Sequence, residues 1–168
     1  LAAINGAIAA TVTQRVAQHR PPLNVLLCEN VHNAATVMRG LLEPLLSAEE
    51  LDQVGLLETS IDRTIPVVEE AIRATDPSVI YVDPCRPLPF DVASVRGPGF
   101  DVPGVVGDPS VPFAFFGERK LYVHNLGHAL TAYLGEREGL DLIADAIAIP
   151  DVLRIVRAVM VESATALA

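Results

Sequence analysis

Residues 23–28 read LNVLLC, a short apolar run that begins directly after Pro21 and Pro22. A run of this length behind helix-breaking residues is typical of a strand buried on both faces. A helical pattern over residues 2–19 precedes it, and another over residues 31–46 follows it. The succession of helix, buried strand and helix indicates part of an α/β layer.

The chain changes character after this layer. Ser47 followed by Glu50 fits a capping box, which predicts a short helix that ends near Gly55. The next stretch, residues 56–66 (LLETSIDRTIP), is expected to be an irregular segment closed by its proline. We therefore place the best division of the chain within this segment.

The second part of the chain is predicted to be mainly helical. Short strand candidates occur at residues 79–82 and 91–95, and the four Gly and four Pro of residues 96–112 predict a long ordered loop. Helices are expected at residues 118–134, 139–148 and 151–167, with Gly135 and Pro150 between them. The fold class is therefore mixed α/β and mostly helical, with one domain over residues 1–58 and a second over residues 59–168.

Composition and charge narrow the class of protein. The chain is 51% hydrophobic and 20% charged, which indicates a folded core and leaves room for an apolar interface in a homo-oligomer. Its formal net charge is −9, so a nucleic-acid partner is not expected. No apolar run has membrane-spanning length, which argues against a membrane partner. Cys28 and Cys85 show no repeated spacing, which favours a reducing compartment and a cytoplasmic protein.

The helix predicted at residues 118–134 carries polar groups suited to chemistry. At about 100° per residue, Lys120, His124, Asn125 and His128 span about 140° of its circumference, and the opposite face is apolar. A solvated face usually carries many Glu and Lys residues, whereas Lys120 is the only lysine of the chain. An ordinary amphipathic surface helix is the alternative interpretation.

The spacing Lys120-x4-Asn125-x2-His128 resembles the signature of the mannitol dehydrogenase family, the polyol-specific long-chain dehydrogenases. Within the family, the surrounding residues are most similar to the mannitol-1-phosphate 5-dehydrogenase branch. Residues 28–30 (CEN) and 60–63 (SIDR) resemble two further family segments in the same order. The resemblance covers nearly the whole chain. It implies the tail of a Rossmann-type cofactor domain followed by the start of a helical substrate domain.

The resemblance also implies a reaction, the metal-independent oxidation of a sugar alcohol or its phosphate with NAD, of the mannitol-1-phosphate/fructose-6-phosphate type. It assigns Lys120 as the general base. A lysine does this near neutral pH only where desolvation or nearby positive charge lowers its pKa to roughly 7–8. Asn125 and Asn30 would donate hydrogen bonds to the developing alkoxide, because amides donate without competing for the proton. His128 would orient the substrate hydroxyl.

Further residues receive roles in substrate and cofactor binding from the same resemblance. Asp62 and Arg63 would bind the substrate, and Asn30 and Ile61 would contact the cofactor. Taken alone, Asn30 is equally well explained as the N-cap of the following helix, and Asp62 as an ion-pair partner of an arginine. NADP in place of NAD and a hexuronate in place of a polyol remain open.

Two other interpretations compete with a metal-independent dehydrogenase. His124 and His128 lie one helical turn apart, and Cys28 and His32 could complete a metal site. An interaction or assembly domain is the second alternative, because no G-x-G-x-x-G occurs in the chain to hold a dinucleotide. The absent motif indicates that the chain is part of a longer protein or an inactive fragment of the family.

Overall fold

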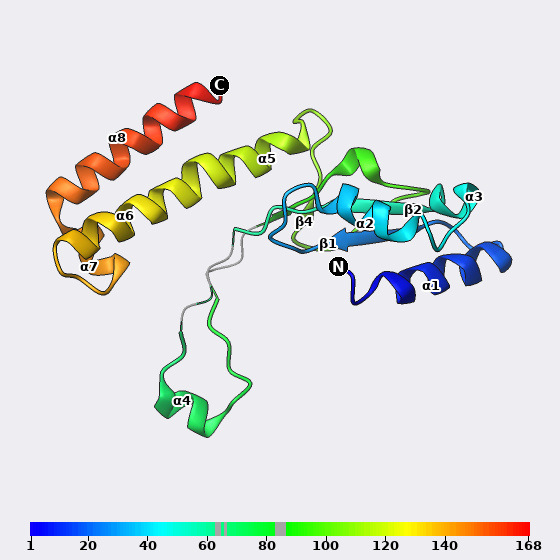
Figure 1. The fold of residues 1–168 in the computed structure, drawn as a ribbon, viewed down its shortest axis with the longest axis horizontal. Helices are drawn as coiled ribbons and strands as arrows, with labels where there is room; N and C mark the ends of the chain where they lie inside the picture. Colours follow the sequence, from blue (N-terminus) through cyan, green and yellow to red (C-terminus); the bar gives the residue numbers. More distant parts are fainter. Residues whose placement is uncertain (63–64, 66, 83–86) are drawn as a thin grey trace. The chain divides into compact units, whose positions relative to one another are not determined.

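The computed structural model describes residues 1–62, 65, 67–82 and 87–168 (Figure 1). Contacts between Cα atoms divide the chain into two compact units, Leu1–Val111 and Pro112–Ala168. The division by contacts falls later in the chain than the functional boundary predicted after residue 58, because residues 89–96 return to the strands of the first unit.

The first unit is built on two parallel strands. Strand β1 (Leu23–Leu27) pairs with β2 (Val54–Glu58), with Leu23 opposite Val54 and Leu27 opposite Glu58. Between them run the helices α2 (Ala34–Leu42) and α3 (Ala48–Leu51), and α1 (Asn5–Ala17) precedes the pair. Parallel neighbours need such a helical crossover, and the mixed α/β fold class is confirmed.

Several predicted elements of this unit are confirmed and one strand was missed. The strand expected at residues 23–28 is β1, and the expected capping box is present at the start of α3. In this box Ser47 Oγ accepts a hydrogen bond from the Glu50 N–H at 3.3 Å, and the Glu50 carboxylate accepts one from the Ser47 N–H at 2.8 Å. The expectation of a helix ending near Gly55, followed by an irregular segment, was wrong. Strand β2 lies there, and its first four residues are buried.

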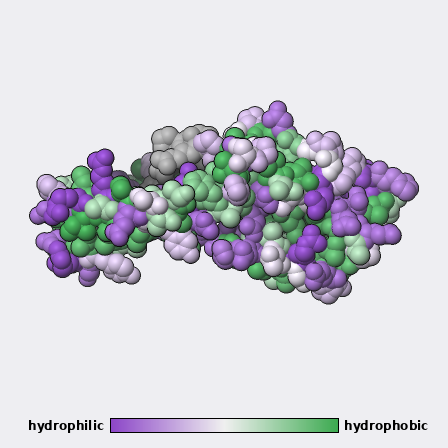
Figure 2. Space-filling view, turned by 90° about the horizontal axis from the view of Figure 1, so that it is seen from above, coloured by the Kyte–Doolittle hydropathy of each residue, from purple (hydrophilic) through white to green (hydrophobic). Residues whose placement is uncertain are grey.

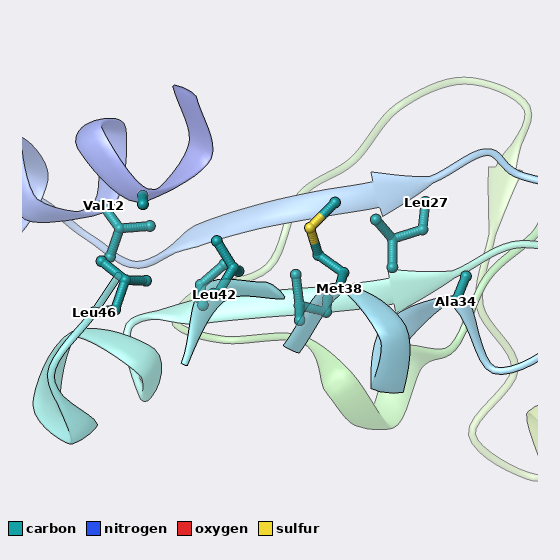
Figure 3. Close-up of a cluster of buried hydrophobic side chains, with 9 residues drawn as sticks. Val12, Leu27, Ala34, Met38, Leu42 and Leu46 are labelled. Carbon is teal, nitrogen blue, oxygen red and sulfur yellow. The ribbon is translucent and has the colours of Figure 1, made fainter. Parts of the chain in front are cut away.

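The core of the first unit lies between the helices and this parallel pair. Met38 and Leu42 of α2 are fully buried against Val12 of α1 and Val54 of β2. Figure 3 shows Met38, Leu42 and Leu27 filling the space beside the strands. Burying side chains of this size contributes roughly 1.5–3 kcal/mol each, so this cluster fixes the position of the strand ends.

Residues that follow β2 pack back onto the strands. The Asn24 side chain donates to the Arg96 carbonyl and accepts from the Arg96 N–H, both at 2.9 Å. A Cβ atom at Gly55 would lie 2.7 Å from the Ser94 carbonyl oxygen, so only glycine lets this segment lie against β2. Residues 94–96 therefore belong to the first unit.

The rest of the first unit has little regular structure. It contains α4 (Glu70–Thr75), the two-residue parallel strands β3 (Leu88–Pro89) and β4 (Val105–Val106), and the 3₁₀ turn η1 (Val92–Ser94). The strands predicted at residues 79–82 and 91–95 were wrong. The first stretch is irregular and mostly exposed, and the second forms η1 because the Asp91 carboxylate caps the Ala93 N–H at 3.1 Å.

The second unit is helical, as predicted. It contains α5 (Phe113–Arg119), η2 (Lys120–Asn125), α6 (Leu126–Arg137), α7 (Ile143–Ala148) and α8 (Pro150–Ala166), and α6 contacts both α7 and α8. In both units, some large apolar side chains are exposed to solvent. Figure 2 shows such apolar residues among polar ones on one face of the chain.

The helix predicted at residues 118–134 runs further than expected. Gly135 was expected to end it, but α6 continues to Arg137 and Gly135 is buried inside it. The helix ends instead in a Schellman motif around Gly139, whose φ is 74°. There the Leu140 N–H donates to the Gly135 carbonyl at 2.9 Å, and the Gly139 N–H donates to the Glu136 carbonyl at 3.0 Å.

Candidate active site

The segment that carries the candidate base is a π-helix. Element η2 begins at Lys120 and ends at Asn125, between α5 and α6, which continue it on either side (Figure 1). In a π-helix the backbone N–H groups bond five residues back instead of four, and such turns are rare and frequent at functional sites. The candidate residues Lys120 and Asn125 are therefore the first and last residues of an unusual turn.

The π-turn changes which side chains share a face. An α-helix turns about 100° per residue, whereas a turn with about one residue more turns about 80° per residue. Over the five steps from Lys120, Asn125 moves from about 140° to about 40° away from the lysine. His128, three α-helical steps further, then lies about 20° from the lysine on its other side. The turn thus brings Lys120, Asn125 and His128 onto one face.

These side chains differ in exposure. Lys120 and Asn125 are half-buried, whereas His128 is exposed. The rings of His124 and His128 lie with their centroids 4.5 Å apart and are tilted by 59°. A half-buried amine and amide beside an exposed imidazole form a polar face that a hydroxylated molecule could contact.

The helix that carries this face is held by α8. A Cβ atom at Gly127 would lie 2.6 Å from Met160 Sδ, so glycine allows close packing of the two helices. The Thr131 hydroxyl, which is buried, donates to the Gly127 carbonyl at 2.7 Å. The Ser163 hydroxyl of α8 donates to the Tyr122 carbonyl, inside the π-turn, at 2.6 Å. Neither Tyr122 nor Ser163 received a role from the sequence, because no residue pattern indicates a contact between helices this far apart in the chain.

The candidate residues of the first unit gather at one edge of the parallel pair. Asn30 lies three residues beyond the end of β1, and Ile61 lies three residues beyond the end of β2. The Thr59 hydroxyl donates to the Leu27 carbonyl at 3.0 Å and ties the two strand ends together. The carboxyl ends of parallel strands are where open α/β sheets bind ligands. Ile61 is half-buried and Asn30 is exposed.

The alternative role of Asn30 as an N-cap is wrong. Helix α2 has Asn33 at its N-cap position, in a left-handed conformation with φ of 56°. The Glu58 carboxylate at the end of β2 accepts from the Ala35 N–H at 2.8 Å, so it serves the start of α2 instead. Asp62 is half-buried beyond the same strand, and Arg63 lies outside the described residues.

The residues suggested for the rival metal site are divided between the two units. Cys28 and His32 are exposed in the first unit, whereas His124 and His128 belong to the second. Over residues 1–62, 65, 67–82 and 87–168, no three His, Cys, Asp or Glu side chains gather closely enough to share a metal ion.

A phosphate group on a substrate needs a cationic partner, for which Arg63, Arg86 and Arg119 are the candidates. Arg119 has its guanidinium 5.7 Å from the centroid of the Phe116 ring, one residue before the candidate base. Arg63 and Arg86 lie outside the described residues.

None of the helices in the described part of the chain combines the length and apolar character needed to span a bilayer.

Comparison with protein families places both units. Residues 1–93 match the model of the mannitol dehydrogenase Rossmann domain, and residues 113–168 match that of the mannitol dehydrogenase C-terminal domain. The two matches follow the order expected from the sequence, with a cofactor-domain portion before a helical one. The chain belongs to the mannitol dehydrogenase family.

Two curated relatives are both mannitol-1-phosphate 5-dehydrogenases. The protein of Brevibacillus brevis is 31% identical over 98% of this chain, and that of Bacillus licheniformis is 32% identical over 93% of it. The aligned regions make up 42% and 41% of those proteins, so the chain spans about two fifths of their length.

A solved structure has the same fold. The mannitol 2-dehydrogenase of Pseudomonas fluorescens, solved as a ternary complex with NAD and D-mannitol, superposes with a TM-score of 0.68 at 23% identity. The match covers 94% of this chain and 35% of that protein. The likeness supports the Rossmann-type assignment of the first unit and the helical assignment of the second.

Proposed function

We propose that this chain provides the substrate-side residues of an NAD-dependent polyol dehydrogenase. The observation that carries the proposal is the π-turn η2, which sets Lys120, Asn125 and His128 on one face in a chain of the mannitol dehydrogenase family. The relatives and the solved structure, by their names, act on mannitol or mannitol 1-phosphate. A secondary alcohol of a hexitol or hexitol phosphate is therefore the proposed substrate.

The chemistry divides between a base and hydrogen-bond donors. The Lys120 amine takes the proton from the substrate hydroxyl, and the alcohol carbon becomes a carbonyl as its hydride leaves. The Asn125 amide donates to the oxygen as negative charge develops on it, a role in which one donor is typically worth about 3–4 kcal/mol. The His128 imidazole, which is exposed, holds the substrate hydroxyl in line.

The residues of the first unit fit a dinucleotide. NAD, when bound, supplies the hydride acceptor. The ends of two parallel strands form the kind of edge that binds dinucleotides, and Ile61 and Asn30 each lie three residues beyond one of these ends. Ile61 offers apolar contact and Asn30 an amide, which is proposed to serve both the cofactor and the reacting oxygen. Asp62 and Arg63 are proposed to bind substrate hydroxyls or phosphate.

The proposed reaction needs no metal ion, because the lysine and the amide together perform the two tasks for which zinc dehydrogenases use their metal. A phosphorylated hexitol is favoured over a free one by the names of the two relatives, and Arg119 beside the base is the described cation best placed to meet a phosphate.

The test is an assay of the complete gene product with NAD or NADP against hexitols, hexitol phosphates and hexuronates. We expect reduction of NAD by one hexitol or hexitol phosphate, undiminished after chelation. Lys120→Arg should lower kcat by about 10²–10⁴-fold, because a guanidinium keeps the charge but stays protonated. Arg137→Ala is the matched control, since it removes an exposed cation paired with Glu138 at 3.2 Å.

Three outcomes would contradict parts of the proposal. A folded protein without turnover on the whole panel would refute the enzymatic function and favour an interaction domain. Loss of activity on chelation, with recovery on adding zinc, would refute the metal-independent mechanism. Equal turnover by the wild type and Lys120→Arg would refute the role of the lysine as base.

A further inference from the structure

We infer that Ser163 is a positioning residue for the candidate base, because it holds the π-turn η2 through the Tyr122 carbonyl. This inference rests on the proposed function, since it concerns the geometry of the same face. The Ser163 hydroxyl donates to that carbonyl at 2.6 Å, across 41 positions of sequence. Its role is to keep Asn125 and Lys120 together.

The hydroxyl lies in an otherwise apolar stripe of α8. Val152 and Val156, which are buried, lie on the same face as Ser163 at helical spacing, and this face meets η2 and α6. An apolar residue would continue the stripe at this position. A half-buried serine whose hydroxyl bonds to another helix indicates a specific requirement for a donor there.

The bond differs from those of the other helical hydroxyls nearby. Thr165, two residues further along α8, donates to the Val161 carbonyl of its own helix at 2.7 Å. Thr131 likewise donates to a carbonyl four residues back, that of Gly127. Such local bonds are the ordinary choice of a hydroxyl in a helix. Ser163 instead reaches the backbone of the π-turn.

The target carbonyl lies where the backbone pattern changes. A carbonyl has two lone pairs, and a side chain that inserts into a helical ladder is a usual cause of local distortion. Helix α8 also packs against the start of α6, just beyond the turn, because Gly127 lies against Met160. The two contacts join Tyr122 to residue 163 and Gly127 to residue 160, so α8 is in contact both inside the turn and just after it.

Without this restraint the turn can relax toward an α-helix. The relaxation would carry Asn125 from about 40° to about 140° away from Lys120 around the helix axis. The amide would then no longer serve the oxygen whose proton the lysine removes. Ser163 itself need not touch the substrate, so the loss should appear in kcat and not in KM.

The experiment compares Ser163→Ala, Ser163→Thr and Thr165→Ala in the complete gene product, with kcat and KM measured on the substrate found above. We expect Ser163→Ala to lower kcat by about three- to tenfold with KM changed less than about twofold, since one hydrogen bond shifts an equilibrium by about that factor. Ser163→Thr keeps the hydroxyl and should restore kcat. Thr165→Ala, which loses only a bond within its helix, should match the wild type. Unchanged kcat in Ser163→Ala, or an equal loss in Thr165→Ala, would overturn the inference.

A second measurement separates this inference from the proposed function. Amide hydrogen exchange over residues 120–127 should be about two- to tenfold faster in Ser163→Ala than in the wild type or Thr165→Ala. If the wild type has no turnover, the proposed function fails while the exchange result still decides whether Ser163 restrains the turn. Equal exchange in all three proteins would refute the restraint.

Discussion

Replacing Gly135 by alanine should destabilise the second unit, although alanine is the better helix former. Gly135 is buried within α6, where that helix meets α7. A Cβ atom there would lie 2.7 Å from the Cβ atom of Ala146. Neither atom can rotate away, because each is fixed directly to a helix backbone, so α7 must move as a whole.

The magnitude follows from two opposing terms. In a helix interior, alanine stabilises the helix by about 1 kcal/mol relative to glycine, because of its higher helix propensity. Overpacking of a close contact costs typically about 1–3 kcal/mol. The sum is a loss of about 0–2 kcal/mol in the free energy of unfolding. Gly117 in α5 is the matched control, because nothing lies within 4 Å of the position that a Cβ atom would take there. Gly117→Ala should therefore show only the gain in helix propensity, without an overpacking cost. The difference between the two variants isolates the overpacking cost, about 1–3 kcal/mol.

Urea unfolding followed by circular dichroism measures this difference. The double variant Gly135→Ala/Ala146→Gly removes the colliding methyl group and should recover most of the overpacking cost, which a mutant cycle reports as coupling between the two sites. If Gly135→Ala were as stable as Gly117→Ala, the close approach of α6 and α7 would be refuted. The contact with Ala146 would then no longer explain why glycine occupies position 135 inside α6.

Three further predictions concern single residues. Asn125→Ala should cost on the order of 3 kcal/mol in the transition state, seen as a fall in kcat; an effect on KM alone would contradict its role as a donor. Glu58→Ala should lower the free energy of unfolding by about 1 kcal/mol, because the start of α2 loses its acceptor for the Ala35 N–H, and a variant as stable as the wild type in urea would exclude that contribution. The pKa of Glu50 is lowered below its ordinary 4.5, first by the Thr13 hydroxyl and then by Ser47. The resulting stability is present above the ordinary pKa and is lost as pH falls through the lowered one. The advantage of the wild type over Glu50→Gln should therefore shrink as the pH falls below the ordinary pKa of 4.5; an advantage independent of pH would refute it.

Local patterns in the sequence were sufficient for part of the fold. The breaker-bounded apolar run at residues 23–28 became β1, and the Ser47–Glu50 capping box started α3. Both depend on neighbours in the chain, which the sequence displays. Strand β2 was missed because its five residues follow a short helix so closely that periodicity could not separate them. Only pairing with β1 shows that Val54–Glu58 is a strand.

For the candidate site, too, local sequence patterns predicted only part of the arrangement. The sequence selected the candidate residues, because the spacing of Lys120, Asn125 and His128 can be read from the chain alone and lies within the region that matches the family's C-terminal domain. A helical wheel at α-helical pitch, however, puts Asn125 about 140° from the lysine. The tertiary structure decided the face that they share. The turn is π-helical. The carbonyl of Tyr122 accepts a hydrogen bond from Ser163, and Gly127 lies against Met160, both on a helix more than 30 residues further along the chain. The pitch of a helix depends on the contacts that its carbonyls and side chains make with neighbouring helices. These contacts are set by packing between segments that are distant in the chain, and no local sequence pattern encodes that packing.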